Sequence, residues 1–297
     1  MSIQWPLVFF TLFIGLGCGT FVGSVILTEW VGKAKQIRTV SAQAAILSIG
    51  IGGVASTLHL GHPERMFGAL GHPTSGIFLE SMLIFLLGLA IVVYLLALRR
   101  EAAAGTCKII GTVGAILATL LTFVNGDAYV MAAIPAWNTL ILPALYLVSA
   151  AVMGCFSISL LLQWSADHKA TATTLTAAET AATTETAAAA AMVKRTTLLA
   201  LAMHAVVLVA YLVHIAAAPY PDVARSVTRV LAGNLAPLFW GGWVLLGLVV
   251  PTALLTRFYT KSNEAMLAKA GFCSVLAAGV AFRALMFLLG SSIKQYF

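Results

Sequence analysis

Apolar residues dominate this chain in runs of about 20, and short polar stretches separate the runs. A helix of that length crosses the hydrocarbon core of a bilayer, because each residue adds about 1.5 Å along the axis. The pattern predicts eight spans, near residues 6–31, 40–60, 75–98, 107–126, 139–163, 196–218, 234–257 and 265–290. We therefore expect an all-α, polytopic membrane protein in which residues 1–297 form a single integral membrane domain.

Basic residues divide unevenly between the two sides of the predicted bundle. Twelve of the 17 Lys and Arg residues follow odd-numbered spans, among them Lys33, Arg99 and Arg257, and five lie on the other side. Cytoplasmic loops of membrane proteins carry an excess of Lys and Arg. With an even number of spans, this asymmetry predicts that both termini lie on the non-cytoplasmic side. It also accounts for the net charge of +7 without nucleic acid binding.

The connection between spans five and six is compositionally simple. Residues 170–191 contain almost nothing but Ala and Thr, with two glutamates. We interpret residues 165–195 as a low-complexity cytoplasmic connection that is partly helical through its alanines.

The stretch from Leu58 to Glu80 differs from the rest of the chain. It holds three histidines, two carboxylates and an arginine, whereas only 9% of all residues are charged. Ionisable groups at membrane depth are costly, so their presence indicates a functional site. Gly-His-Pro occurs at 61–63 and again at 71–73, which predicts an outer turn that contributes architecture and a docking surface for a partner.

Counting residues from the ends of the spans gives each polar side chain a depth. His59, Glu80 and Arg283 come from three different spans and reach the same outer level. The same layer is predicted to contain Asp127, Tyr129, Trp137 and His214. Depth alone leaves open whether these groups also meet laterally. Three structural alternatives remain: His59 caps a helix, His214 bonds to a backbone carbonyl, and Arg283 reaches outward to water.

Other polar residues have simpler interpretations. Glu29, beside Trp30 at the inner end of the first span, is expected to be an ordinary interfacial charge. His204 lies near mid-membrane, where we expect a hydrogen bond to a neighbouring helix. The four cysteines have no spacing that suits zinc or an iron–sulfur cluster, so no metal site is predicted.

The predicted outer layer has the groups that oxidation of a lipid-soluble quinol requires. Each ring oxygen needs a hydrogen-bond partner, and a base must accept protons as electrons leave. His59 is the candidate base, Glu80 a proton relay, and Arg283 a cation that keeps Glu80 ionised. His204 and His214 share one span about 15 Å apart, so they cannot ligate one haem together. We expect no haem and no iron–sulfur cluster in this chain, and an electron acceptor in another subunit.

Several motifs resemble a known family. They are Ser56-Thr57-Leu58-His59-Leu60-Gly61-His62-Pro63 with Arg65, then Leu79-Glu80-Ser81, Ile134-Pro135-Ala136-Trp137, and a late Arg283. Together with the eight-span plan, these residues are similar to the membrane anchor subunit of anaerobic dimethyl sulfoxide reductase, the DmsC family.

The resemblance implies a function in a respiratory complex of the prokaryotic cytoplasmic (inner) membrane. Such an anchor oxidises menaquinol and passes electrons to an iron–sulfur subunit, which feeds a molybdopterin catalytic subunit. The resemblance implies that His59 and Glu80 are quinol-site residues of this chain, with Arg283 as a further candidate. The terminal acceptor and the direction of the quinone reaction stay open.

Two other classes of protein compete with this interpretation. A secondary transporter or ion channel would place polar groups near the midplane and form a path across the membrane. This chain concentrates its polar groups at one face, which favours the quinol site. A cytochrome b-like subunit would need facing histidines, for which only His59 with His214 remains geometrically possible.

Overall fold

The computed structural model of the chain describes residues 3–58, 75–170, 177–219, 221–257 and 263–290. His59 and the predicted outer turn at 59–74 lie outside these residues. Nearly all of the described chain is helical, as the apolar runs predict. The elements are α1 Trp5–Val25, η1 Ile26–Trp30, η2 Lys35–Ile37, α2 Arg38–Thr57, α3 Gly76–Arg99, α4 Ala104–Asp127, α5 Ile141–Ala170, α6 Ala177–Ala216, α7 Pro221–Leu231, η4 Pro237–Val249, α8 Val250–Thr256 and α9 Glu264–Leu289.

Eight helices in the described chain are long and apolar enough to cross a membrane, which confirms the predicted number of spans. The seventh span combines η4 with α8, and the sixth begins earlier than predicted because α6 already starts at Ala177. The short helix α7 was not predicted. It is too short and too polar to appear in a search for apolar runs of about 20 residues. The Trp240 indole of η4 donates to the Leu231 carbonyl at 2.8 Å and so attaches α7 to the bundle.

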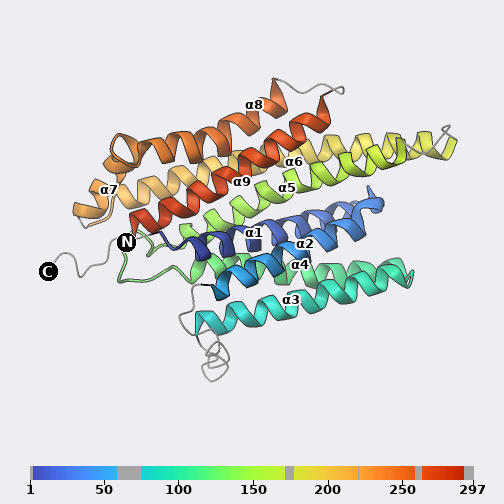
Figure 1. Cartoon of the computed structure of the whole chain (residues 1–297), viewed down its shortest axis with the longest axis horizontal. Coiled ribbons are helices and arrows are strands. Elements are labelled where there is room, and N and C mark those ends of the chain that lie inside the picture. The colour runs from blue at the N-terminus through green and yellow to red at the C-terminus, as the bar shows by residue number, and fades with distance from the viewer. Residues whose placement is uncertain (1–2, 59–74, 171–176, 220, 258–262, 291–297) are drawn as a thin grey trace.

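The spans run roughly parallel to one axis, as Figure 1 shows. The start of α1 and the end of α9 lie at the same end of the bundle, which we call the terminal end. The connection from α3 to α4 lies at the opposite end, where α5 and α6 extend past the other helices. At about 1.5 Å per residue, the 30 residues of α5 and 40 of α6 exceed the roughly 30 Å of a hydrocarbon core.

Helix α1 lies at the centre and packs against α2, α4, α5 and α9. Its closest approach to α5 is made by Gly19 and Gly154, which face each other backbone to backbone. A methyl group on either glycine would overlap the backbone of the other helix. Small residues allow this approach in membranes, where association depends on close van der Waals contact.

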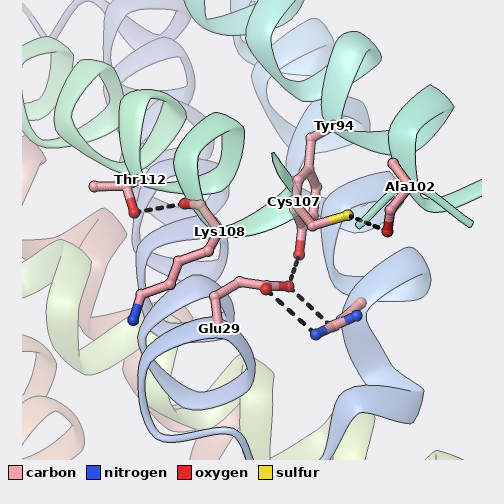
Figure 2. Close-up of polar contacts among 7 residues, drawn as sticks. Glu29, Tyr94, Ala102, Cys107, Lys108 and Thr112 are labelled. Carbon is pink, nitrogen blue, oxygen red and sulfur yellow. Dashed lines mark hydrogen bonds and ion pairs between the residues drawn. The ribbon is translucent and has the colours of Figure 1, made fainter. Parts of the chain in front are cut away.

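A buried ion pair joins η1, α2 and α3 near the opposite end of the bundle. In Figure 2 the Tyr94 hydroxyl donates a hydrogen bond of 2.6 Å to the Glu29 carboxylate. Arg38 adds an ion pair, with Nε 2.9 Å from Oε1 and Nη2 3.2 Å from Oε2. The side chain of Glu29 is only 2% exposed. The expectation of an ordinary interfacial charge was therefore wrong, because α2 and α3 cover this carboxylate and supply its partners.

Trp30, the next residue, connects the same region to α4. Its indole donates to the Thr112 hydroxyl at 3.1 Å, and Lys108 Nζ lies 4.0 Å from the centre of its ring. The first four spans are thus held together at this end by polar contacts of Glu29 and Trp30, which both lie in the π-helical turn Ile26–Trp30.

Replacing Glu29 by Gln should destabilise the protein by about 3 kcal/mol, because the substitution leaves the Arg38 cation without its buried counter-charge. The measurement is thermal unfolding of the detergent-solubilised protein. Glu101→Gln is the matched control, since Glu101 is an exposed carboxylate at the same end of the bundle. Equal stability of the two variants would contradict a stabilising role for the pair.

Candidate functional site

Glu80 lies in the second turn of α3, at the terminal end of the bundle. The Ser75 side chain caps this helix by accepting a hydrogen bond from the Phe78 amide at 3.2 Å, which fixes where α3 begins. Glu80 is half-buried and makes no hydrogen bond or ion pair with any other residue that the structure describes. A carboxylate in this position is available to a ligand.

Arg283 of α9 is completely buried. Its Nε donates to the Thr11 hydroxyl at 2.9 Å, Nη2 to the Thr11 carbonyl at 3.0 Å, and Nη1 to the Gly279 carbonyl at 3.1 Å. The guanidinium also lies 5.2 Å from the centre of the Tyr146 ring. The structure thus excludes the alternative in which Arg283 reaches outward to water. Among the described residues no carboxylate forms an ion pair with it, so a full cation sits among neutral groups.

Four aromatic rings gather beside this arginine and form what we call the aromatic cluster: Tyr129, Trp137, Tyr146 and Phe287. Tyr129 stacks on Tyr146 at 6.0 Å and meets Trp137 edge to face at 5.5 Å. Phe287 of α9 completes the group at 5.9 Å from Tyr129. The Trp137 indole donates to the Met286 carbonyl at 2.9 Å, which fastens the connection between α4 and α5 onto α9.

Tyr129 of the cluster interacts electrostatically with both charged groups. Burial is the main cause that raises the pKa of the Tyr129 phenol well above its ordinary value. Tyr146 and the charge of Glu80 add to this rise in pKa, and the Arg283 cation opposes it. Glu80 and Arg283 therefore both lie within electrostatic range of Tyr129, and no direct ion pair joins them among the described residues.

The structure brings together four of the residues predicted from depth: Glu80, Tyr129, Trp137 and Arg283. Asp127 and His214 are exposed, and neither makes a described contact with the aromatic cluster. The predicted roles of Asp127 and His214 in a ligand site rest on depth alone. His59, which was predicted for the same site, lies outside the described residues.

Two contributors were missed by sequence reasoning: Thr11 and Tyr146. Both types of residue are common in apolar spans and carry no charge, so they do not stand out in composition. Their depth was a usable signal, because each lies about one and a half turns from the terminal end of its helix. Tyr146 became relevant only when the fold placed it against Arg283.

His204 takes no part in this layer. It accepts a hydrogen bond at Nε2 from the Trp243 indole at 3.1 Å, which confirms the predicted bond between neighbouring helices. A separate cavity of about 290 Å³ lies among α1, α4, α5 and α6, with a mostly apolar lining that includes Val22, Leu147 and Val193. It contains neither Glu80 nor Arg283, and it offers no charged side chain. The chemistry-bearing groups are therefore in the layer at the terminal end, not in this cavity.

The fold and this layer define a class: a polytopic membrane protein of eight helical spans with a charged and aromatic layer near one face. The family model of the DMSO reductase anchor subunit (DmsC) matches residues 1–289. The chain therefore belongs to the DmsC family and is a multi-pass protein of the bacterial inner membrane. Members of this family are part of an oxidoreductase complex. No curated protein matches the chain.

The phenol of Tyr129 should remain protonated well above pH 10. Its raised pKa means that the neutral form is favoured, so Tyr129 contributes no phenolate at a pH where free tyrosine is half ionised. An alkaline titration of phenolate absorbance checks this by comparing wild-type protein with Tyr129→Phe. The two curves should coincide through the range in which free tyrosine titrates, and loss of a step near pH 10 in the variant would show that the phenol is solvated.

Proposed function

We propose that this chain oxidises menaquinol at the layer formed by Glu80, the aromatic cluster and Arg283, and passes the electrons to an iron–sulfur partner subunit. The observation that carries the proposal is an aromatic cluster that packs against the buried Arg283 guanidinium, beside the start of α3, where the half-buried Glu80 carboxylate has no partner among the described residues. DmsC anchors bind menaquinol without haem and associate with iron–sulfur and catalytic subunits, which supports the same assignment.

Oxidation of a quinol removes two electrons and two protons from one ring. The protons need an acceptor near neutral pH and a route out of the apolar region. In our proposal His59 takes a proton from a ring hydroxyl and Glu80 relays it toward the outer surface. The aromatic cluster forms apolar walls for the ring, and its hydroxyl groups and the Arg283 cation make one side of the site polar.

The electrons leave through another polypeptide. The molybdopterin subunit of the complex carries out reduction of the terminal acceptor, and the anchor supplies the quinol site and holds the complex on the membrane. Its electron-accepting partner must then dock close enough to the site for electrons to pass from the quinol ring.

The orientation that fits this proposal places the terminal end outside the cytoplasm. The start of α1 and the end of α9 share that end of the bundle, and most basic residues lie in connections at the other end. The Ala/Thr-rich connection at 165–195 is then cytoplasmic.

Topology reporters test this orientation. A periplasm-active phosphatase fused after residue 290 should be active, and the same enzyme fused at residue 102, in the connection from α3 to α4, should be inactive. A fluorescent protein that matures only in the cytoplasm should give the opposite pattern. Reversed patterns would place the site on the cytoplasmic side.

Variants at the two proposed proton-handling residues test the function. In the assembled complex, His59→Ala should lower quinol-dependent turnover by about 100-fold, and Glu80→Gln by about tenfold or more, because each removes a group that accepts protons. Turnover driven by an artificial donor that feeds the catalytic subunit directly should be unchanged.

Glu101→Gln provides the matched control for these variants, since it removes an exposed carboxylate far from the layer. Quinol-dependent turnover that stays at the wild-type level in both His59→Ala and Glu80→Gln would overturn the proposed site.

A further inference from the structure

Asn125, near the end of α4, has a side-chain amide that is buried and unsatisfied. The residue is 1% exposed, and neither its Oδ1 nor its Nδ2 has a hydrogen-bond partner in the described part of the chain. Buried amides in proteins nearly always have partners, because leaving them unpaired costs free energy comparable to a lost hydrogen bond. An amide with both functions unused therefore suggests a ligand.

The packing register of α3 and α4 places this amide level with Glu80. The two helices run in opposite directions, and three contacts define how they match: Tyr94 with Gly111, Ala90 with Gly114, and Gly76 with Ala128. In each pair the residue numbers add to 204 or 205, so the register is constant along the whole interface. Asn125 and Glu80 fit the same register, so they lie at the same level of the interface.

Both residues also continue the buried faces of their helices. On each helix a row of buried or half-buried positions recurs at steps of three or four residues, as expected for one face. On α4 the positions are Gly111, Gly114, Ala118 and Leu121, followed by Asn125; on α3 they are Tyr94, Ile91 and Leu87, followed by Ile84 and Glu80. Asn125 and Glu80 are therefore the polar ends of two apolar stripes that pack together.

The central helix α1 connects this level to the buried arginine. Val25 of α1 lies against Gly111 and Phe21 against Gly114, so α1 also runs opposite to α4. Nearer the terminal end, α1 carries Thr11. Thr11 is the residue that accepts two hydrogen bonds from Arg283. One layer thus receives polar groups from α1, α3, α4, α5 and α9.

We propose that Asn125 is a ligand-binding residue of the quinol site, whose amide forms a hydrogen bond with one ring oxygen. This inference rests on the proposed function. The Oδ1 atom accepts a hydrogen bond from a quinol hydroxyl, and the Nδ2 group donates one to a quinone carbonyl. An amide does not titrate, so it holds both redox forms without a proton change of its own.

Glu80 and Asn125 then have different duties toward the same ring. As the quinol is oxidised, it loses two protons and two electrons. The electrons go to the iron–sulfur subunit, and both protons leave one after the other through Glu80 to the outer surface. Asn125 keeps the ring in place while the ring oxygen changes from a hydrogen-bond donor to an acceptor. A purely structural pair of Asn125 with Glu80 would instead form a hydrogen bond between them, and the structure has none.

The decisive variant is Asn125→Leu in the assembled complex, because leucine keeps a similar volume and removes both polar functions. The measurements are the Kd for menadione, a short naphthoquinone, the KM and kcat with reduced menadione as donor, and the melting temperature with and without menadione. Asn138→Leu is the matched control, since Asn138 is an exposed asparagine in the neighbouring connection between α4 and α5.

In Asn125→Leu we expect the Kd for menadione and the KM for its quinol to rise about tenfold, the effect of one hydrogen bond to a ligand. The melting temperature without ligand should be unchanged or higher, because the substitution removes two unsatisfied polar atoms, and the stabilisation by menadione should be reduced. Asn125→Ala should give the same rise in Kd without adding bulk. Artificial-donor turnover should stay at the wild-type level in both variants.

A lower ligand-free melting temperature together with a wild-type Kd in Asn125→Leu and Asn125→Ala would show that the amide is structural and overturn the inference. That result leaves the quinol site itself in place, because the wild-type complex would still bind menadione and oxidise its quinol. If the wild-type complex does neither, the proposed function fails together with this inference.

Discussion

Polar groups inside a hydrocarbon medium need partners, and this constraint governs the whole structure. Apolar helices satisfy their own backbones, so eight of them cross the membrane without further help. Charged side chains have no such solution and must be satisfied by other helices. Glu29 forms an ion pair with Arg38 and accepts a hydrogen bond from Tyr94, and Arg283 donates hydrogen bonds to Thr11 and Gly279. Each of these contacts also fixes how the helices stand relative to one another.

The two ends of the bundle use this constraint differently. At the end opposite the termini, the Glu29 carboxylate has an ion-pair partner and a hydrogen-bond donor, so the site is complete and serves stability. At the terminal end, Glu80 and Asn125 have no partner in the described chain, and Arg283 has only neutral ones. Groups left incomplete in this way are costly to the folded protein, and in the proposed quinol site a bound ligand completes them.

Membership of the DmsC family and the geometry of this layer support the same function through different arguments. The family explains why a chain without evident redox groups belongs to an oxidoreductase complex. In the proposed function, the layer handles the proton side of quinol oxidation with a carboxylate, two phenols and a guanidinium drawn from several helices. Apolar rings surround these groups, which suits a hydrophobic ring with polar oxygens.

The sequence by itself determined the spans, because hydrocarbon thickness sets the length of an apolar helix and the count follows from runs of that length. It also determined which charges lie near the terminal end, since helical rise converts position into depth. Glu80 and Arg283 were identified in this way. Depth says nothing about direction around a helix axis, however, so Tyr146, Thr11 and Asn125 escaped notice and Glu29 was assigned to the membrane surface. Only the tertiary structure decided which side chains at equal depth meet, because that depends on close helix contacts such as Gly19 with Gly154 and Gly111 with Tyr94.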